Sequence, residues 1–185
     1  NITGFSTKIK LVKNYPYNSY VTKRSMSWGQ GSWRRVWKLF KKEFEKRNHK
    51  QIFNDNKNLQ LLISGGEDLL VTLKLDYLKH VQSIQVWWIW NILKNKGLCI
   101  NPINSLISNA GYDGSGTHSR VGEEFPSSKN YNKKKFMNNL NYFPEINDNF
   151  RKKFCIKRKT FLIFKYFPST IHNYLYILKL KVKML

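Results

Sequence analysis

The sequence predicts a mixed α/β fold that is rich in helices. Aromatic residues recur three or four positions apart between residues 33 and 44, which is the apolar stripe of an amphipathic helix. A second segment, residues 84–93, is apolar nearly all round and is too short to cross a bilayer, so we expect a central buried helix. Short extended apolar pieces predict strands near residues 2–5, 20–22 and 98–100.

The first strand and the first helix are separated by a segment with a functional appearance. Gly4 within the first strand indicates a bulge or a close backbone approach. Ser32 is a suitable N-cap for the helix, and we expect its aromatic stripe to pack in the core. Trp28, just before Gly29 in a loop, offers a flat apolar face of the kind that stacks on a sugar ring or a base. The stripe consists of Trp33, Trp37, Phe40 and Phe44.

A second helix is expected after Ser64-Gly65-Gly66, opened by Glu67 and Asp68 and running to about His80. Acidic residues in a first helical turn are favoured by the helix dipole, which is a sufficient structural reason for this pair. A functional alternative is that the flexible glycines deliver a carboxylate to the edge of a cleft, where it acts as a general base. The expected buried face of this helix comprises Leu69, Leu70, Leu73, Tyr77 and His80.

The buried helix over residues 84–93 is expected to end at Lys94-Asn95-Lys96-Gly97, with cations in its last turn and a glycine C-cap. His49, His80 and His172 fall in expected helices and are interpreted as structural or solvated. His118 alone lies in a loop that looks functional.

That loop covers residues 111–119 and carries three glycines in six positions. Its backbone can lie close to a ligand, and its N–H groups can cradle an anion. A plain solvated turn is the alternative. The loop contains Gly111, Tyr112, Asp113, Gly114, Ser115, Gly116, Thr117 and His118.

The formal net charge of +22 is confined to the two ends of the chain. Residues 1–48 carry 12 basic and 2 acidic side chains, residues 49–128 carry 7 of each, and residues 129–185 carry 14 and 2. Such ends attract a polyanion, either nucleic acid or an anionic membrane surface, although compositional drift would give the same pattern. Cys99 and Cys155 lie far apart without CxxC spacing, which disfavours a disulfide framework or a zinc site and fits a reducing compartment.

The two ends of the chain also shape the expected organisation. The first residues lack the features of a signal peptide, and we expect the chain to be a fragment of a longer protein. Residues 127–149 are rich in Ser, Asn and Lys and are expected to form a linker. Residues 150–185 are expected to form a basic amphipathic helical tail that suits an anionic bilayer surface.

Taken in order, the motifs resemble the C-terminal half of bacterial family-two glycosyltransferases, which make capsule, O-antigen and related surface glycans and are distantly similar to the N-acetylglucosaminyltransferase I type. The resemblance covers about residues 1–120. The motifs that carry it are Ser27-Trp28-Gly29, the aromatic-basic helix, Gly65-Gly66-Glu67-Asp68-Leu69, the Trp-rich helix, Asn101-Pro102 and the loop Gly111-Tyr112-Asp113-Gly114-Ser115-Gly116-Thr117-His118.

The resemblance implies that residues 1–126 are the C-terminal portion of a GT-A, Rossmann-like domain that uses a nucleotide-sugar donor and a glycan or lipid-linked acceptor. It implies a divalent metal, Mn or Mg, whose main acidic ligands lie outside this chain, with His118 as a further ligand. It also implies a cytoplasmic protein, peripheral at the inner face of the plasma membrane, with no specific nucleic-acid partner. Within the chain, the implied donor contacts are Gly114, Ser115, Gly116, Thr117 and His118, and the implied acceptor contacts are Trp28, Gly29 and Asp113.

Two departures from the family pattern bear on activity. Gln30 follows Trp28-Gly29 where the family often has a second Trp, and Gln82 stands where the family usually has Asp. We expect Asp68, with Glu67 behind it, to be the base of an inverting displacement. The alternatives are an inactive remnant of the enzyme and a basic nucleic-acid-binding protein.

Overall fold

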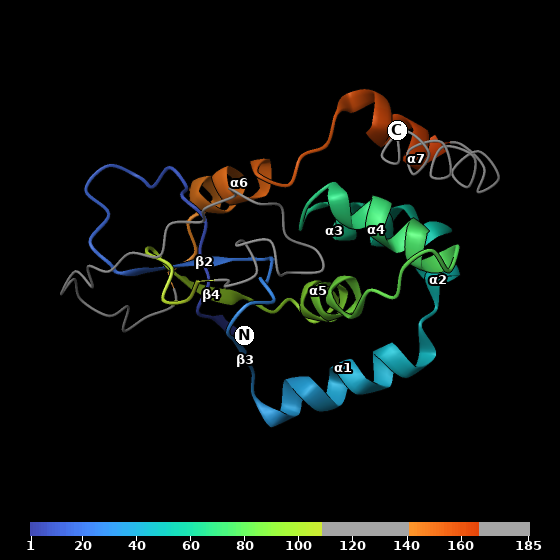
Figure 1. The fold of residues 1–185 in the computed structure, drawn as a ribbon, viewed down its shortest axis with the longest axis horizontal. Helices are drawn as coiled ribbons and strands as arrows, with labels where there is room; N and C mark the ends of the chain where they lie inside the picture. The colour runs from blue at the N-terminus through green and yellow to red at the C-terminus, as the bar shows by residue number, and fades with distance from the viewer. Residues whose placement is uncertain (109–140, 167–185) are drawn as a thin grey trace. The chain divides into compact units, whose positions relative to one another are not determined.

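The computed structural model describes residues 1–108 and 141–166 of the chain. Across those residues it has seven helices and one four-stranded mixed sheet, which confirms the mixed α/β class (Figure 1). The chain divides into two compact units, one containing Asn1–Lys38 and Lys96–Phe150, the other containing Leu39–Asn95 and Arg151–Leu185. Each unit is therefore built from segments that are distant in the sequence.

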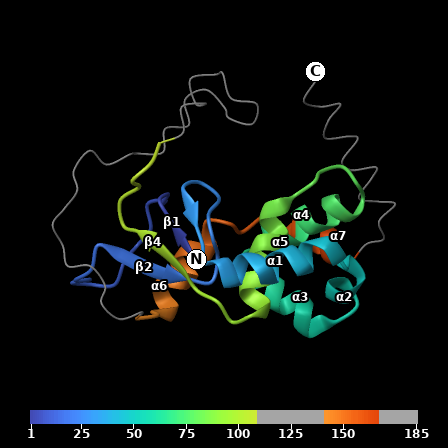
Figure 2. The same ribbon diagram turned by 90° about the horizontal axis from the view of Figure 1, so that it is seen from below.

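The first unit contains the sheet, whose strand order is β2-β4-β1-β3. The neighbouring strands β2, β4 and β1 are labelled in Figure 2. β2 runs antiparallel to β4, β4 runs parallel to β1, and β1 runs antiparallel to β3. Strands form at all three of the expected places. The strands are β1 (Ile2–Thr3), β2 (Ser19–Thr22), β3 (Gln30–Gly31) and β4 (Cys99–Pro102).

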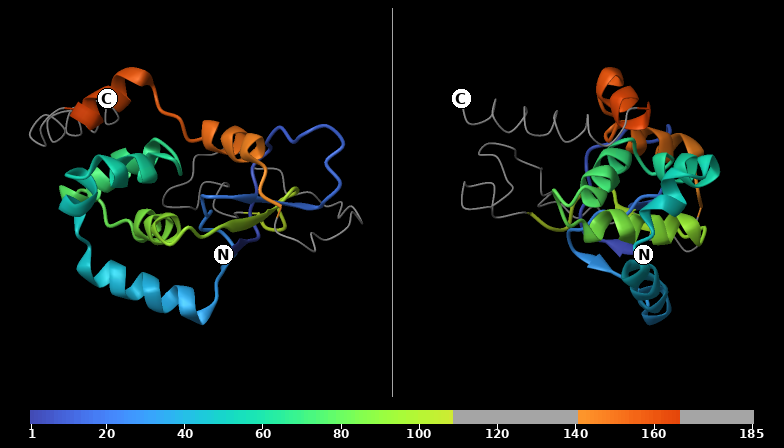
Figure 3. Two further views of the ribbon diagram at one scale, coloured as in Figure 1. Left: turned by 180° about the vertical axis from the view of Figure 1, so that it is seen from behind. Right: turned by 90° about the vertical axis from the view of Figure 1, so that its right-hand side faces the viewer.

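Buried polar contacts fix the pairing of β2 with β4. The Asn101 side chain donates from Nδ2 to Thr22 Oγ1 at 2.9 Å, and all four residues of β2 are buried. Helix α6 (Pro144–Lys152) packs beside β2, where Asn147 Oδ1 accepts the Lys23 backbone N–H at 2.9 Å (Figure 3). The Phe150 ring lies 6.0 Å from that of Tyr20. The first six residues of α6, 144–149, thus lie in the segment for which we expected a linker.

The second unit is helical. Helix α1 begins in the first unit and ends in the second. Helices α2, α3, α4 and α5 gather together, and α7 packs against α4 (Figures 1 and 2). The bounds are α1 (Arg34–Lys46), α2 (His49–Phe53), α3 (Asn56–Ile63), α4 (Asp68–Tyr77), α5 (Ile84–Lys94) and α7 (Arg158–Tyr166). None of the helices in the described residues is long and apolar enough to cross a bilayer.

Helix α5 is the core of this unit, as its composition predicts. Every residue from 86 to 93 is buried, and the Ser83 hydroxyl caps the helix by accepting the Val86 N–H at 3.2 Å. A Cβ placed on Gly65 would lie 3.0–3.4 Å from three apolar side chains of α4 and α5, so glycine permits the close packing at this point. The helix ends at Lys94 with Asn95 as its C-cap, and the left-handed residue that follows is Lys96, with φ of 53°, rather than the expected Gly97.

Two expected buried faces are only partly correct. On α1, Phe40 is buried against Trp88 with ring centres 4.7 Å apart, but Trp33 and Trp37 are exposed. On α4, the leucines are buried as expected, but Tyr77 is 40% exposed. Helical periodicity places side chains on one face, but what covers that face depends on packing partners that the pattern does not contain.

Candidate functional site

The predicted site residues fall into three groups. Trp28 and Gly29 lie in the loop between β2 and β3 of the first unit. Glu67 and Asp68 lie at the start of α4 in the second unit. The predicted donor and metal contacts lie outside the described residues, as does Asp113, so their roles stay predictions. Those contacts are Gly114, Ser115, Gly116, Thr117 and His118.

The Trp28-Gly29 loop is held firmly against β1. Gly29 O accepts the Gly4 N–H at 2.9 Å, which confirms the close backbone approach predicted at Gly4. Gly29 has φ of +60°, and a Cβ there would lie 2.9 Å from Ile107 Cδ1, so both conformation and space require glycine. The Trp28 ring is half-buried, with its centre 4.6 Å from that of Phe5 in an edge-on arrangement. The loop therefore holds a large aromatic ring in a fixed position.

The two carboxylates of α4 have different surroundings. Glu67 Oε2 accepts the Ile156 backbone N–H at 3.1 Å, and the Asp68 backbone N–H donates to Phe154 O at 3.3 Å. These contacts fasten the segment before α7 to the start of α4. The Glu67 carboxylate therefore has a structural task at the start of α4.

A buried carboxylate that the sequence did not single out lies at the opposite end of α4. The Asp76 side chain is 6% exposed and accepts three hydrogen bonds. The donors are His49 Nε2 at 2.8 Å and Trp87 Nε1 at 2.9 Å, both to Oδ2, and the Ser83 backbone N–H at 2.9 Å, to Oδ1. Asp76 therefore joins α2, α4 and the start of α5. Because a carboxylate accepts hydrogen bonds, this contact places a proton on Nε2 of His49.

His49 lines two hollows in the second unit. The first has a volume of about 620 Å³ and is also lined by Lys46, Arg47 and Lys50; the second, of about 550 Å³, is also lined by Arg47 and Lys79. Within the described residues, none of these four cations forms a salt bridge. The hollows therefore present positive charge to a ligand.

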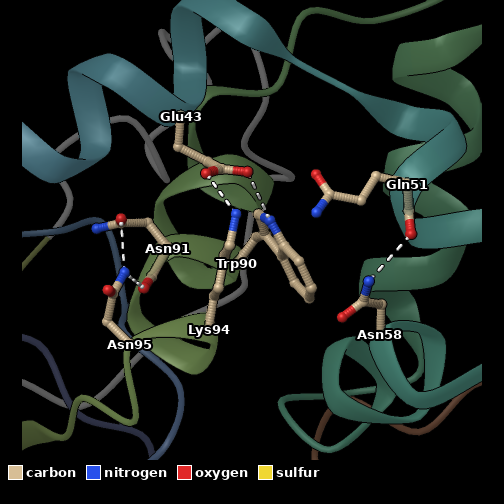
Figure 4. Close-up of polar contacts among 7 residues, drawn as sticks. All are labelled: Glu43, Gln51, Asn58, Trp90, Asn91, Lys94 and Asn95. Carbon is tan, nitrogen blue, oxygen red and sulfur yellow. Dashed lines mark hydrogen bonds and ion pairs between the residues drawn. The ribbon is translucent and has the colours of Figure 1, made fainter. Parts of the chain in front are cut away.

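The acidic residue that lines the first hollow is already satisfied. Glu43 accepts from Lys94 Nζ at 2.8 Å and from Trp90 Nε1 at 3.1 Å (Figure 4). On the facing side, Asn58 Nδ2 donates to the backbone oxygen of Gln51 at 3.1 Å, which ties α3 to α2 (Figure 4). The pair Glu43–Lys94 is close to neutral, so it does not cancel the charge of the remaining cations.

Sequence reasoning missed this arrangement, although one local signal was present. Residues 46–50 read Lys-Arg-Asn-His-Lys, a short basic run around a histidine. We interpreted His49 as structural or solvated, and its contact with Asp76 confirms a structural part. What the run does not reveal is the partner carboxylate 27 residues away, which only the packing of α2 against α4 brings close.

The described residues do not supply a metal site. No group of three or more His, Cys, Asp or Glu side chains in residues 1–108 and 141–166 could hold a metal ion. The expected divalent metal therefore stays a prediction, and we derive no step through it. On α4, partial burial lowers the pKa of Lys74, whose Nζ lies 6.0 Å from the centre of the Phe53 ring.

Comparison of the chain with protein-family models, with curated proteins and with solved structures found no match.

Proposed function

We propose that this chain is part of an inverting glycosyltransferase that transfers a sugar from a nucleotide-sugar donor to a glycan or lipid-linked acceptor in bacterial surface-polysaccharide synthesis. The observation that carries the proposal is the order of the sequence motifs between residues 27 and 118, which resembles the C-terminal half of a GT-A domain. A mixed α/β fold is compatible with it.

The Trp28-Gly29 loop supports the acceptor part of the proposal. Sugar rings present apolar C–H faces, and a large aromatic ring in a fixed position binds such a face with little loss of side-chain entropy. Trp28 is held by Phe5 and by a hydrogen bond from Thr3 Oγ1 to its backbone oxygen at 2.9 Å. Gly29, exposed beside it, allows a sugar hydroxyl to approach the backbone.

The chemistry would be a single displacement. Asp68 takes the proton of the acceptor hydroxyl, the acceptor oxygen forms a bond to the anomeric carbon, and the bond from that carbon to the diphosphate breaks. The nucleoside diphosphate leaves with the bonding electron pair. Glu67 contributes by fastening residues 154–156 to α4, which positions its neighbour rather than accepting the proton.

The test separates these two carboxylates by isosteric substitution. Asp68→Asn and Glu67→Gln each remove one charge, and the Gln oxygen can still accept the Ile156 N–H. We expect Asp68→Asn to reduce release of nucleoside diphosphate by at least a hundredfold at unchanged acceptor binding, and Glu67→Gln to reduce it less than tenfold. The assay uses the chain within its full native protein, with a panel of UDP-, GDP- and TDP-sugars and lipid-linked acceptors. Full turnover in Asp68→Asn would remove Asp68 from the mechanism.

Gln82 makes the inactive remnant a distinct outcome of the same assay. Gln82 precedes the Ser83 cap of α5, at the place where the family usually has Asp. An amide cannot accept a proton as a carboxylate does. Binding of acceptor without turnover, restored by Gln82→Asp, would show that the base of the family is missing and that Asp68 does not replace it.

A second candidate function, binding of nucleic acid, is favoured by the surface of α1. Trp33 and Trp37 are 46% and 55% exposed and lie among cationic residues, including Arg34 and Arg35. Exposed aromatic rings interleaved with cations are typical of surfaces that bind single strands. A salt titration with a single-stranded oligonucleotide distinguishes the two functions, because release of counterions from the nucleic acid would make the affinity fall steeply with salt.

A further inference from the structure

We propose that the two hollows around His49 form a binding site for a phosphate or diphosphate group of a small ligand. We call this the His49 site and define it by Lys46, Arg47, His49, Lys50 and Lys79. It does not rest on sugar transfer, because none of these five residues has a role in the proposed function, although Gln82 also lines the second hollow.

The first argument is charge. Five cations line the hollows; Lys94 pairs with Glu43, and within the described part of the chain the other four pair with no carboxylate. The two acidic residues that also line them, Glu43 and Asp76, are both engaged, the first by Lys94 and Trp90 and the second by three donors. A ligand that enters therefore meets uncompensated positive charge, which favours an anion with several acceptor oxygens.

The second argument is preorganisation of His49. Its Nε2 is hydrogen-bonded to Asp76. Its ring packs edge-on against Trp87, with ring centres 4.9 Å apart, and lies tilted against Tyr77, with ring centres 5.4 Å apart. Its Nδ1 forms no hydrogen bond within the described residues. The ring is thus fixed while one polar atom remains for a ligand, and a protonated Nδ1 can donate to a phosphate oxygen.

The third argument is size. The hollows have volumes of about 620 and 550 Å³ and share Arg47, His49 and Tyr77 among their lining residues. Pockets of roughly 300–1,000 Å³ are typical for small molecules and cofactors. Tyr77, which is partly exposed, supplies an aromatic surface beside the cations for the organic part of such a ligand.

The test measures binding of inorganic pyrophosphate by calorimetry at low salt. We expect Lys50→Gln and Arg47→Gln each to weaken binding by about tenfold, as for the loss of one charge-assisted hydrogen bond. The matched control is Lys57→Gln, which removes the same charge from α3 outside both hollows and should change affinity less than twofold. Equal weakening by Lys57→Gln, or no binding of pyrophosphate to the parent chain, would overturn the proposal.

A second readout follows the ring itself. Pyrophosphate should shift the NMR signals of one histidine ring, and that signal should be missing from a His49→Gln variant. Competition then identifies the source of the group: displacement of pyrophosphate by UDP indicates a nucleotide, and displacement by vesicles that contain an isoprenyl diphosphate indicates a lipid carrier. Displacement by a single-stranded oligonucleotide alone would show a polyanion surface in place of a small-ligand site.

Discussion

Replacing Asp76 by Asn tests the hydrogen-bond network that fixes His49. Both carboxylate oxygens of Asp76 accept from donors, so an amide nitrogen must face a donor whichever way the side chain turns. In one orientation it faces the Ser83 N–H, and in the other it faces the indole N–H of Trp87. A buried donor left without an acceptor costs about 1–3 kcal/mol, so we expect Asp76→Asn to lower the unfolding free energy by about 2 kcal/mol.

The same geometry predicts that the loss depends on Trp87. In a Trp87→Phe background, the amide nitrogen can occupy the Oδ2 position and donate to His49 Nε2, while the amide oxygen accepts the Ser83 N–H. Every remaining group is then satisfied, provided that His49 carries its proton on Nδ1. Asp76→Asn should therefore cost less than about 1 kcal/mol in this background, which is a coupling of at least about 1 kcal/mol between residues 76 and 87.

The assay is urea unfolding followed by circular dichroism at pH 8. Trp88→Phe provides the matched control, because it removes a buried indole from the next position of α5. Trp88 is not one of the three hydrogen-bond donors to Asp76. Its effect should add to that of Asp76→Asn. Equal losses for Asp76→Asn in the parent and Trp87→Phe backgrounds, within about 0.5 kcal/mol, would refute the reasoning.

Three further predictions concern packing and pH. Gly29→Ala should destabilise the first unit by about 1–3 kcal/mol, because its φ is positive and a Cβ would meet Ile107. At Gly31 a Cβ would meet no atom within 4 Å, so Gly31→Ala should change stability by less than about 0.5 kcal/mol. Urea unfolding of the two variants side by side checks this. Gly65→Ala should lower the melting temperature of the second unit, since its Cβ would lie 3.0 Å from an apolar side chain. Burial raises the pKa of the Cys99 thiol from 9.0 to about 11, so the neutral thiol stabilises the fold below pH 9 and that contribution is lost as the pH rises toward 11. Between pH 8 and 10.5 the unfolding free energy from urea titrations should fall by about 2 kcal/mol, and Cys99→Ala should reduce this fall. An unchanged fall in Cys99→Ala would contradict the assignment.

How far the sequence predicts this molecule depends on how local the signal is. The buried helix α5 was predictable because residues 86–93 are apolar nearly all round, with Asn91 the one polar residue, so burial is the stable outcome whatever surrounds them. The close approach at Gly4 was also readable, because a glycine within a strand commonly marks it. In contrast, Trp33 and Trp37 form a correct helical stripe with Phe40 and yet lie exposed, since periodicity does not specify a partner surface.

The His49 site could not be predicted for a different physical reason. His49 and Asp76 are separated by 27 residues, and each has an ordinary local explanation, a histidine in a basic run and an acidic residue on an amphipathic helix. Their interaction exists only after α2 packs beside α4 and α5 supplies Trp87. Sequence reasoning favoured Asp68 as the base, with Glu67 behind it, but it did not show that the Glu67 carboxylate accepts a hydrogen bond from the Ile156 backbone N–H.

The interleaving of the two units has a consequence for how the chain reaches its native state. Pairing of Ile2 with Ile100 joins two strands across nearly a hundred intervening residues, and closing a loop of that length opposes folding by about 4 kcal/mol of chain entropy. The helices between residues 39 and 95 have mostly short-range connections, which form quickly. Their early collapse would draw the distant strands together, so a substitution that loosens α5 should slow assembly of a sheet it does not belong to.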